Sequence, residues 1–363
     1  TRYWRDWSSD VCSSDLRAST SRWLRYGLIA NLVLLAVLIG GVLSQAYPAT
    51  EAVRLRNALL MEVGRPSDFD WTPDSAPHDF RVLERDPYPE FRDAAEEITS
   101  PYGGDWQRAL ALAARLTQNA KDTGAIQADL LTTYRSIIDK GSGYCADYTD
   151  VYLGLAHAAG LGVRNWAFSF DGFGGHGHSF IEVFDRQRGR WVFMDVYNNF
   201  HVVDRASGKA LSALEFRQHL LGRGNPVRIV PNGPGRMGYI IEEKLFDYYR
   251  RGAAEWYLWW GNAVFAYDAH PAVQLAGKFA RPLEQLAAIA ANVHPHFRVL
   301  ATPENAGQIE RMVRLRSKLQ AVFAVVAALL LLLLLQIVLL VRRHVMSSPA
   351  TCPPKTETVQ ESG

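Results

Sequence analysis

The stretch GSGYCADYTDVYLGLAHAAGLGVRNW, residues 141–166, decides how the middle of this chain folds. Ser142 and Gly143 are typical of a helix start, and the glycines at its far end are typical of a helix stop. Between them, apolar side chains recur at helical spacing: Val151, Tyr152, Leu155 and Ala159. From residue 163 the period changes to two, which predicts a strand. Cys145 therefore lies at the first turn of a predicted helix, and it is the only cysteine between the chain's two long apolar runs.

A β-hairpin is predicted immediately downstream. HSFIEVFD (178–185) and RWVFMDVY (190–197) alternate in hydrophobicity, and DRQRG lies at the turn between them. If the turn is centred on residues 186–187, His178 faces Asp195 across the hairpin. Opposed residues have Cβ atoms about 5 Å apart, which permits an imidazole–carboxylate hydrogen bond. A longer turn that includes Gly189 would shift this register by one or two residues.

These residues suggest nucleophilic chemistry. The free backbone N–H groups and dipole of a helix start favour a thiolate and can hold an oxyanion. Such a thiol needs a base that a third group orients, and His178 with Asp195 would complete a Cys-His-Asp triad. His176 is a rival base, and the two histidines with Cys145 or Asp195 could instead ligate zinc, although such a pair is a weak signal. A lone cysteine can also be a small core residue.

GYCADYTDVYLGLAHAAGLGVR followed by HSFIEVFDRQRGRWVFMDV resembles the core of the transglutaminase-like superfamily, over roughly residues 106–200. The resemblance implies a papain-like α+β core, with helices packed on a small antiparallel sheet. It also implies that an acyl group is held as a thioester and passed to water or an amine. By position it assigns Cys145 as nucleophile, His178 as base and Asp195 as the orienting carboxylate. It implies no metal and no organic cofactor.

The chain departs from the family's pattern at two positions: Val196 stands where proline is common, and Phe180 stands where tryptophan is usual. The family's second oxyanion donor is not assigned by the resemblance. The residues that we expect to line the cleft around the triad are Tyr144, His176, Trp106 and Asn198.

Two segments without charged residues, 26–50 and 319–341, reach the length of about 20 apolar residues that crosses a bilayer. We interpret both as transmembrane helices, although the first could be a cleaved signal peptide. Arg17, Arg22 and Arg25 before the first span, with Arg342 and Arg343 after the second, favour cytoplasmic termini. Six basic residues at the inner ends of the spans count against this orientation. We predict a protein of the bacterial inner membrane whose intervening domain is extracytoplasmic.

Composition sets the remaining boundaries. Residues 1–16 resemble translated sequencing-adapter DNA, so we interpret them as an artefact and expect the natural N-terminus to be missing. The prolines of 51–105 predict an irregular stalk, 106–203 is the predicted core, and 342–363 is a predicted disordered tail. Residues 204–318 are predicted to form a helical C-terminal extension with a long aromatic helix over 242–267.

We therefore expect a membrane-anchored enzyme of acyl transfer or of amide or peptide hydrolysis, and hydrolysis is the favoured branch. Its compartment suggests the bilayer as a partner and peptides, proteins or acylated glycans of the cell envelope as substrates. The 39 basic and 37 acidic residues give no reason to expect nucleic-acid binding, and the oligomeric state stays open. The alternative is an inactive module that binds a glycan or peptide, in which Trp256, Trp259 and Trp260 form an aromatic platform.

Overall fold

The computed structural model describes residues 10–47, 49–80, 82, 85–121, 124–126 and 128–347. The chain divides into two compact units. One unit holds Thr1–Gln45 with Ser317–Gly363, and the other holds Ala46–Arg316.

Where the structure describes it, the first unit contains two long helices, α1 (Asp10–Gln45) and most of α12 (Ala306–Ser347). Both are long and apolar enough to cross a membrane, which indicates membrane association. The side-chain amide of Asn31 donates to the backbone oxygen of Leu329 (3.1 Å) and to Oε1 of Gln336 (3.2 Å). The polar side chains of the two apolar helices thus form hydrogen bonds between the helices, as is common for helices that pack in a membrane.

The expected tails differ from the structure where it describes them. Residues 342–347 continue α12, so the predicted disorder does not begin at 342. No proline or glycine interrupts this stretch, and helix propagation continues through it. Residues 10–16 likewise belong to α1. Residues 1–9 and 348–363 of the predicted artefact and tail lie outside the described residues.

The second unit contains ten helices and eight strands among its described residues. The helices are α2 (Ala49–Leu60), α3 (Pro89–Thr99), α4 (Asp105–Thr117), α5 (Leu130–Lys140), α6 (Cys145–Ala158), α7 (Ala213–Leu220), α8 (Glu242–Gly252), α9 (Val264–Ala269), α10 (Pro271–Gly277) and α11 (Arg281–Ala290). The strands are β1 (Met61–Gly64), β2 (Val163–Ser169), β3 (Gly177–Asp185), β4 (Arg190–Met194), β5 (Phe200–Asp204), β6 (Val227–Pro231), β7 (Trp256–Trp260) and β8 (His296–Leu300). Three short 3₁₀ turns are η1 (Pro66–Phe69), η2 (Pro73–Ser75) and η3 (Pro303–Asn305).

The α+β class is confirmed, but the sheet is larger than the small antiparallel sheet we expected. Six strands lie in the order β1-β8-β7-β2-β3-β4, and β1 is parallel to β8 while the other pairs are antiparallel. Strands β5 and β6 form a separate pair. The strands of the predicted core, β2, β3 and β4, therefore form only half of the main sheet, and strands from both flanking segments complete it.

Two predicted boundaries are corrected by these added strands. Residues 51–105 are not an irregular stalk throughout, because they contain most of α2 and all of β1 and α3. The extension 204–318 is not purely helical, because it contributes β6, β7 and β8. The predicted helix over 242–267 is wrong: α8 ends at Gly252 and WYLWW forms β7. Consecutive aromatic residues fit a buried strand better than a helix, since their side chains pack well on a pleated surface.

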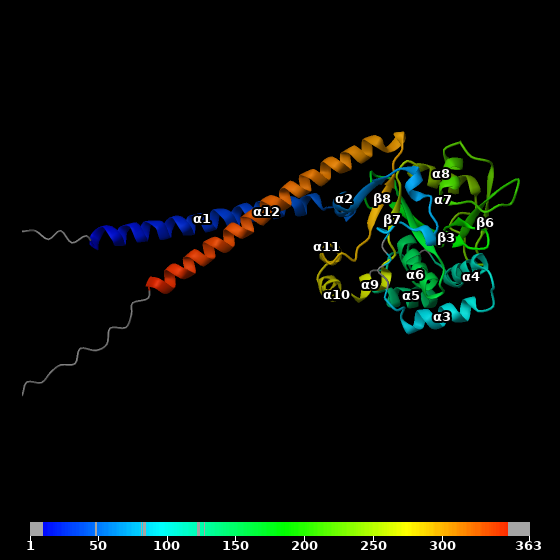
Figure 1. Ribbon diagram of the computed structural model, residues 1–363, viewed down its shortest axis with the longest axis horizontal. Coiled ribbons are helices and arrows are strands. Elements are labelled where there is room, and N and C mark those ends of the chain that lie inside the picture. The colour runs from blue at the N-terminus through cyan, green and yellow to red at the C-terminus, as the bar shows by residue number, and fades with distance from the viewer. Residues whose placement is uncertain are drawn as a thin grey trace, which may run out of the picture. The chain divides into compact units, whose positions relative to one another are not determined.

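Alternating side chains of β3 divide the core into two layers. Ile181 and Val183 pack with α3–α6, while Phe180 and Phe184 pack with α7 and α8. Figure 1 shows these two groups of helices on opposite sides of the strands. Trp256 and Trp260 are 0% and 2% exposed within the aromatic layer. They therefore support the core and offer no open platform for a ligand.

A buried ion pair joins β2 to β3. Glu182 is fully buried and accepts hydrogen bonds from Arg164 Nε (2.6 Å), Trp166 Nε1 (2.5 Å) and the backbone N–H of Ala213 (2.6 Å). The guanidinium of Arg164 lies over the ring of Trp191 at 4.3 Å from its centroid. The carboxylate joins β2, β3 and the start of α7, so Glu182 is a structural residue.

The hairpin has the longer of the two turns considered. Asp185 pairs with Arg190, so four residues, 186–189, form the connection, and Gly189 has a φ of 63°. The carboxylate of Asp185 accepts from the N–H groups of Gln187 (3.1 Å) and Arg188 (3.3 Å), which stabilises this turn. The pairing that places His178 directly opposite Asp195 is therefore wrong by two residues.

Candidate active site

Cys145 is the first residue of α6, as the sequence predicts. The chain turns sharply before it because Gly141 and Gly143 adopt φ values of 68° and 118°, which favour glycine. Oδ2 of Asp147 accepts from the backbone N–H of Tyr144 at 2.8 Å and caps the helix start. The thiol is free and half-buried. It lies where a helix has backbone N–H groups without intrahelical acceptors.

His178 and Asp195 form a buried pair despite the shifted register. His178 Nε2 lies 2.7 Å from Asp195 Oδ2, and the two residues are 4% and 0% exposed. Strand β4 ends at Met194, and the backbone of Asp195 pairs with Phe200 instead. The imidazole and the carboxylate are thus diagonal neighbours, which long side chains can still bridge.

Cys145 lies near enough to the imidazole for its side chain to raise the pKa of His178. Since Nε2 bonds Asp195, the nitrogen available to the sulfur is Nδ1. Burial alone would lower the pKa of His178, but the charges of Asp195 and Cys145 and their hydrogen bonds raise it to about 10. His178 is therefore an imidazolium at neutral pH, placed between a carboxylate and a sulfur.

Asp195 is surrounded by donors. Oδ2 accepts from Asn198 Nδ2 (2.6 Å) and from the hydroxyl of Tyr249 (2.6 Å), in addition to His178. Oδ1 accepts from the backbone N–H of Asn198 (2.9 Å), and Asn232 Nδ2 donates to the backbone oxygen of Asp195 (2.9 Å). Burial raises the pKa of Asp195, but the charge of His178 and these hydrogen bonds bring it below its usual value. The carboxylate therefore stays ionised although no solvent reaches it.

Comparisons of the chain with protein-family models, with curated proteins and with solved structures gave no match in any of the three.

The four predicted cleft residues fall in different places. Asn198 joins the triad directly, and Tyr144 is 46% exposed beside the thiol at the helix start. His176 is exposed in the loop before β3. Trp106 is buried, with its ring edge-on to His201 at 5.1 Å between centroids. No three His, Cys, Asp or Glu residues gather to hold a metal in the part of the chain that the structure describes.

Sequence reasoning missed Tyr249. It lies 54 residues after Asp195 on α8 and reaches the carboxylate from the opposite layer of the fold. Its pKa is raised well above its usual value by burial and by the neighbouring carboxylate, so its hydroxyl remains a donor. One sequence signal existed: helical spacing places Leu245, Phe246 and Tyr249 on one buried face of α8. Nothing in that pattern indicates which carboxylate the hydroxyl meets.

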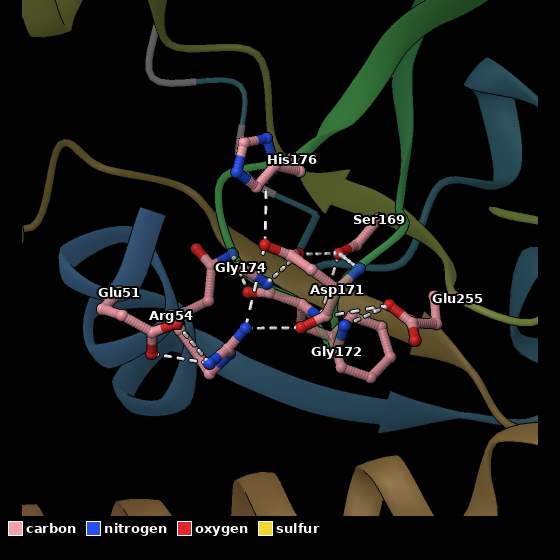
Figure 2. Close-up of polar contacts among 10 residues, drawn as sticks. Glu51, Arg54, Ser169, Asp171, Gly172, Gly174, His176 and Glu255 are labelled. Atoms are coloured by element: carbon pink, nitrogen blue, oxygen red, sulfur yellow. Dashed lines mark hydrogen bonds and ion pairs between the residues drawn. The ribbon is translucent and has the colours of Figure 1, made fainter. Parts of the chain in front are cut away.

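The glycine-rich loop 171–176 fixes the start of β3 and hence His178 (Figure 2). Asp171 Oδ1 accepts from Gly174 N at 3.0 Å, and Arg54 of α2 donates to the backbone oxygen of Asp171 at 2.5 Å. Glu255 Oε2 accepts from the N–H of Gly172 at 2.8 Å. The loop is therefore clamped from both sides, by α2 and by the residue that precedes β7.

Proposed function

We propose that this chain is a membrane-anchored enzyme of transglutaminase-like type that uses Cys145, His178 and Asp195 for acyl transfer or amide hydrolysis. The observation that carries the proposal is the buried hydrogen-bonded pair of the His178 imidazolium and the ionised Asp195, with Cys145 near enough to the imidazole to raise its pKa. A cationic imidazole beside a cysteine at a helix start, with a carboxylate that orients the imidazole, is the arrangement that nucleophilic cysteine chemistry needs.

The proposed reaction has two halves. In the first, the sulfur of Cys145 bonds to the carbonyl carbon of an amide, and the resulting oxyanion is held by backbone N–H groups of the first turn of α6. The C–N bond then breaks, and the leaving amine takes the proton from Nδ1 of His178, which leaves a thioester.

In the second half, the neutral His178 takes a proton from water or from an acceptor amine, whose oxygen or nitrogen bonds to the thioester carbon. The C–S bond breaks, and the thiolate and the imidazolium are restored. Asp195 keeps its charge throughout and holds the ring with Nδ1 toward the sulfur. Water as the acceptor gives hydrolysis, which we favour, and an amine gives transfer.

We also propose that the α+β unit lies on the extracytoplasmic side of a bacterial membrane. Two apolar helices hold the α+β unit at a membrane, and the basic residues outside them favour an extracytoplasmic position for it. Peptides, proteins or acylated glycans of a bacterial envelope are the substrates that such an enzyme would meet. The binding-module alternative rests on an aromatic platform of three tryptophans, of which Trp256 and Trp260 are buried in the core and only Trp259 is partly exposed.

The rate of Cys145 alkylation as a function of pH tests the proposal. We would use the full chain in lipid nanodiscs with Cys12→Ser and Cys352→Ser, so that Cys145 is the only thiol. We expect rapid reaction with iodoacetamide to persist at pH 6, well below the free-cysteine pKa of about 8.5. In His178→Gln the rate should instead fall about tenfold per pH unit below that value. His176→Gln, two residues away and exposed, is the matched control and should behave as the parent.

A parent protein whose alkylation follows an ordinary free thiol, or is indifferent to His178→Gln, would refute the enzyme. If the thiol is activated, an activated acyl ester should leave a thioester on Cys145 that mass spectrometry detects. The rates at which water and added amines remove this thioester then distinguish hydrolysis from transfer.

A further inference from the structure

The helical hairpin of α10 and α11 exposes large apolar side chains. Phe279, at its tip, is 75% exposed, and its neighbours on the two helices are also exposed: Leu275 (59%), Leu283 (49%) and Leu286 (51%). Val273 and Ala288 are instead buried at 3% and 0% and seat the hairpin on the unit. The outward face of the hairpin is thus apolar although it does not contribute to the core. An exposed apolar face of this kind usually marks a docking site.

The charges of this hairpin are mostly positive. Lys278 and Arg281 are exposed on either side of Phe279. Glu284 is the only acidic residue between His270 and His294, and its carboxylate accepts from the hydroxyl of Tyr267 (2.8 Å) and pairs with Arg281. An apolar tip flanked by basic side chains fits the interface of a bilayer, where acyl chains lie next to anionic headgroups.

The hairpin also lies at the edge of the α+β unit from which the chain leads to both apolar spans. Arg316, the last residue of this unit, donates through Nε to the backbone oxygen of Ala58 in α2 at 2.7 Å. The guanidinium of Arg56, also on α2, lies over the ring of Trp259 at 5.5 Å, and that ring lies 5.7 Å from His294. His294 follows α11 by four residues, and within this unit Figure 1 shows α2, α10 and α11 on the same side.

We propose that the tip of the α10–α11 hairpin inserts into the interfacial layer of the bilayer that the two apolar helices cross. The occupant of the apolar face is then lipid. Because both ends of the unit continue into those helices, the bilayer is present at high effective concentration, and a small apolar face suffices for docking. This inference rests on membrane association and does not depend on the chemistry of Cys145.

Fluorescence quenching in nanodiscs tests this. The full chain with its three cysteines replaced by serine would carry one cysteine, at Phe279→Cys or Leu283→Cys, labelled with the polarity-sensitive dye NBD. The control is Ile240→Cys, because Ile240 is 90% exposed and directly precedes the start of α8, which Figure 1 shows on the other side of the unit from α10 and α11. Each disc would hold one protein copy in three parts phosphatidylcholine and one part phosphatidylglycerol.

We expect lipids with a doxyl group near the headgroup to quench NBD at 279 and 283 at least threefold more than at 240. Aqueous iodide should quench in the opposite order. Equal iodide quenching at all three positions, with no quenching by doxyl lipid, would overturn the proposal. Protection from iodide that appears only in discs with two copies, again without doxyl quenching, would also overturn it and assign the face to a second copy of the chain.

Discussion

Replacing Tyr249 by phenylalanine removes one hydroxyl from the buried carboxylate of the candidate triad and leaves the ring that packs in the aromatic layer. The lost bond is short, 2.6 Å, and it is made to an ionised oxygen. Hydrogen bonds to charged groups contribute about 1.5–3 kcal/mol, whereas neutral ones contribute about 1 kcal/mol. Since His178 and Asn198 still donate to the same oxygen, the carboxylate is not left unpaired, and we expect a loss of about 2 kcal/mol.

This loss should depend on pH in a defined direction. The pKa of Asp195 is lowered in the folded protein, so its interactions stabilise the fold above the unfolded pKa of about 3.9. That contribution disappears as the pH falls through the lower, folded pKa. The difference between the parent and Tyr249→Phe should therefore be constant from pH 8 to pH 5 and should shrink below about pH 4.

Thermal and denaturant unfolding of the full chain in nanodiscs, followed by tryptophan fluorescence, measures this difference. Tyr248→Phe is the matched control, since the hydroxyl of Tyr248 is not one of the donors to Asp195 and its side chain is only half-buried. A Tyr249→Phe protein as stable as the parent at pH 7 would refute the hydrogen bond's role. A loss of the same size at pH 7 and pH 3 would refute its attribution to the ionised carboxylate.

Two further predictions follow from buried charges. Because the folded pKa of His178 is about 10 and the unfolded value is about 6.5, its ionic stabilisation is complete below pH 6.5 and is lost as the pH rises through 10. The difference in unfolding free energy between the parent and His178→Gln should shrink across that window, and a difference independent of pH would contradict it. Glu182→Ala leaves Arg164 buried without its carboxylate and should cost about 3–5 kcal/mol in denaturant unfolding. A cost below about 1 kcal/mol would show that Arg164 finds another partner or solvent.

The local elements were predictable because their signals lie within a few residues. The glycines before Cys145 and the helical spacing after it predict α6, and alternation predicts β2, β3 and β4. The turn length was ambiguous because Asp185 and Gly189 together stabilise a four-residue connection that alternation alone cannot distinguish from a shorter one. His178 still reaches Asp195 because the pair tolerates a diagonal arrangement.

The long-range parts were not predictable from local pattern. Strand β1 is only four residues long and follows directly from α2, and its place in the sheet depends on β8, more than 230 residues later. The strand WYLWW was mistaken for helix because apolar residues on every side fit either a buried strand or a buried helix. Tyr249 was missed because its partner, Asp195, is set by how the layers of the fold pack.

These long-range strands show how much of the chain the candidate site needs. Strand β2 carries no site residue, but its pairing with β3 fixes the position of His178 in the sheet. The other edge of β2 pairs with β7. Strand β7 in turn pairs with β8, and β8 with β1, which follows α2. Asp195 receives a hydrogen bond from α8, beyond the predicted core of 106–203. The unit that positions Cys145, His178 and Asp195 is therefore the whole of residues 46–316, including both segments that lead to the apolar helices.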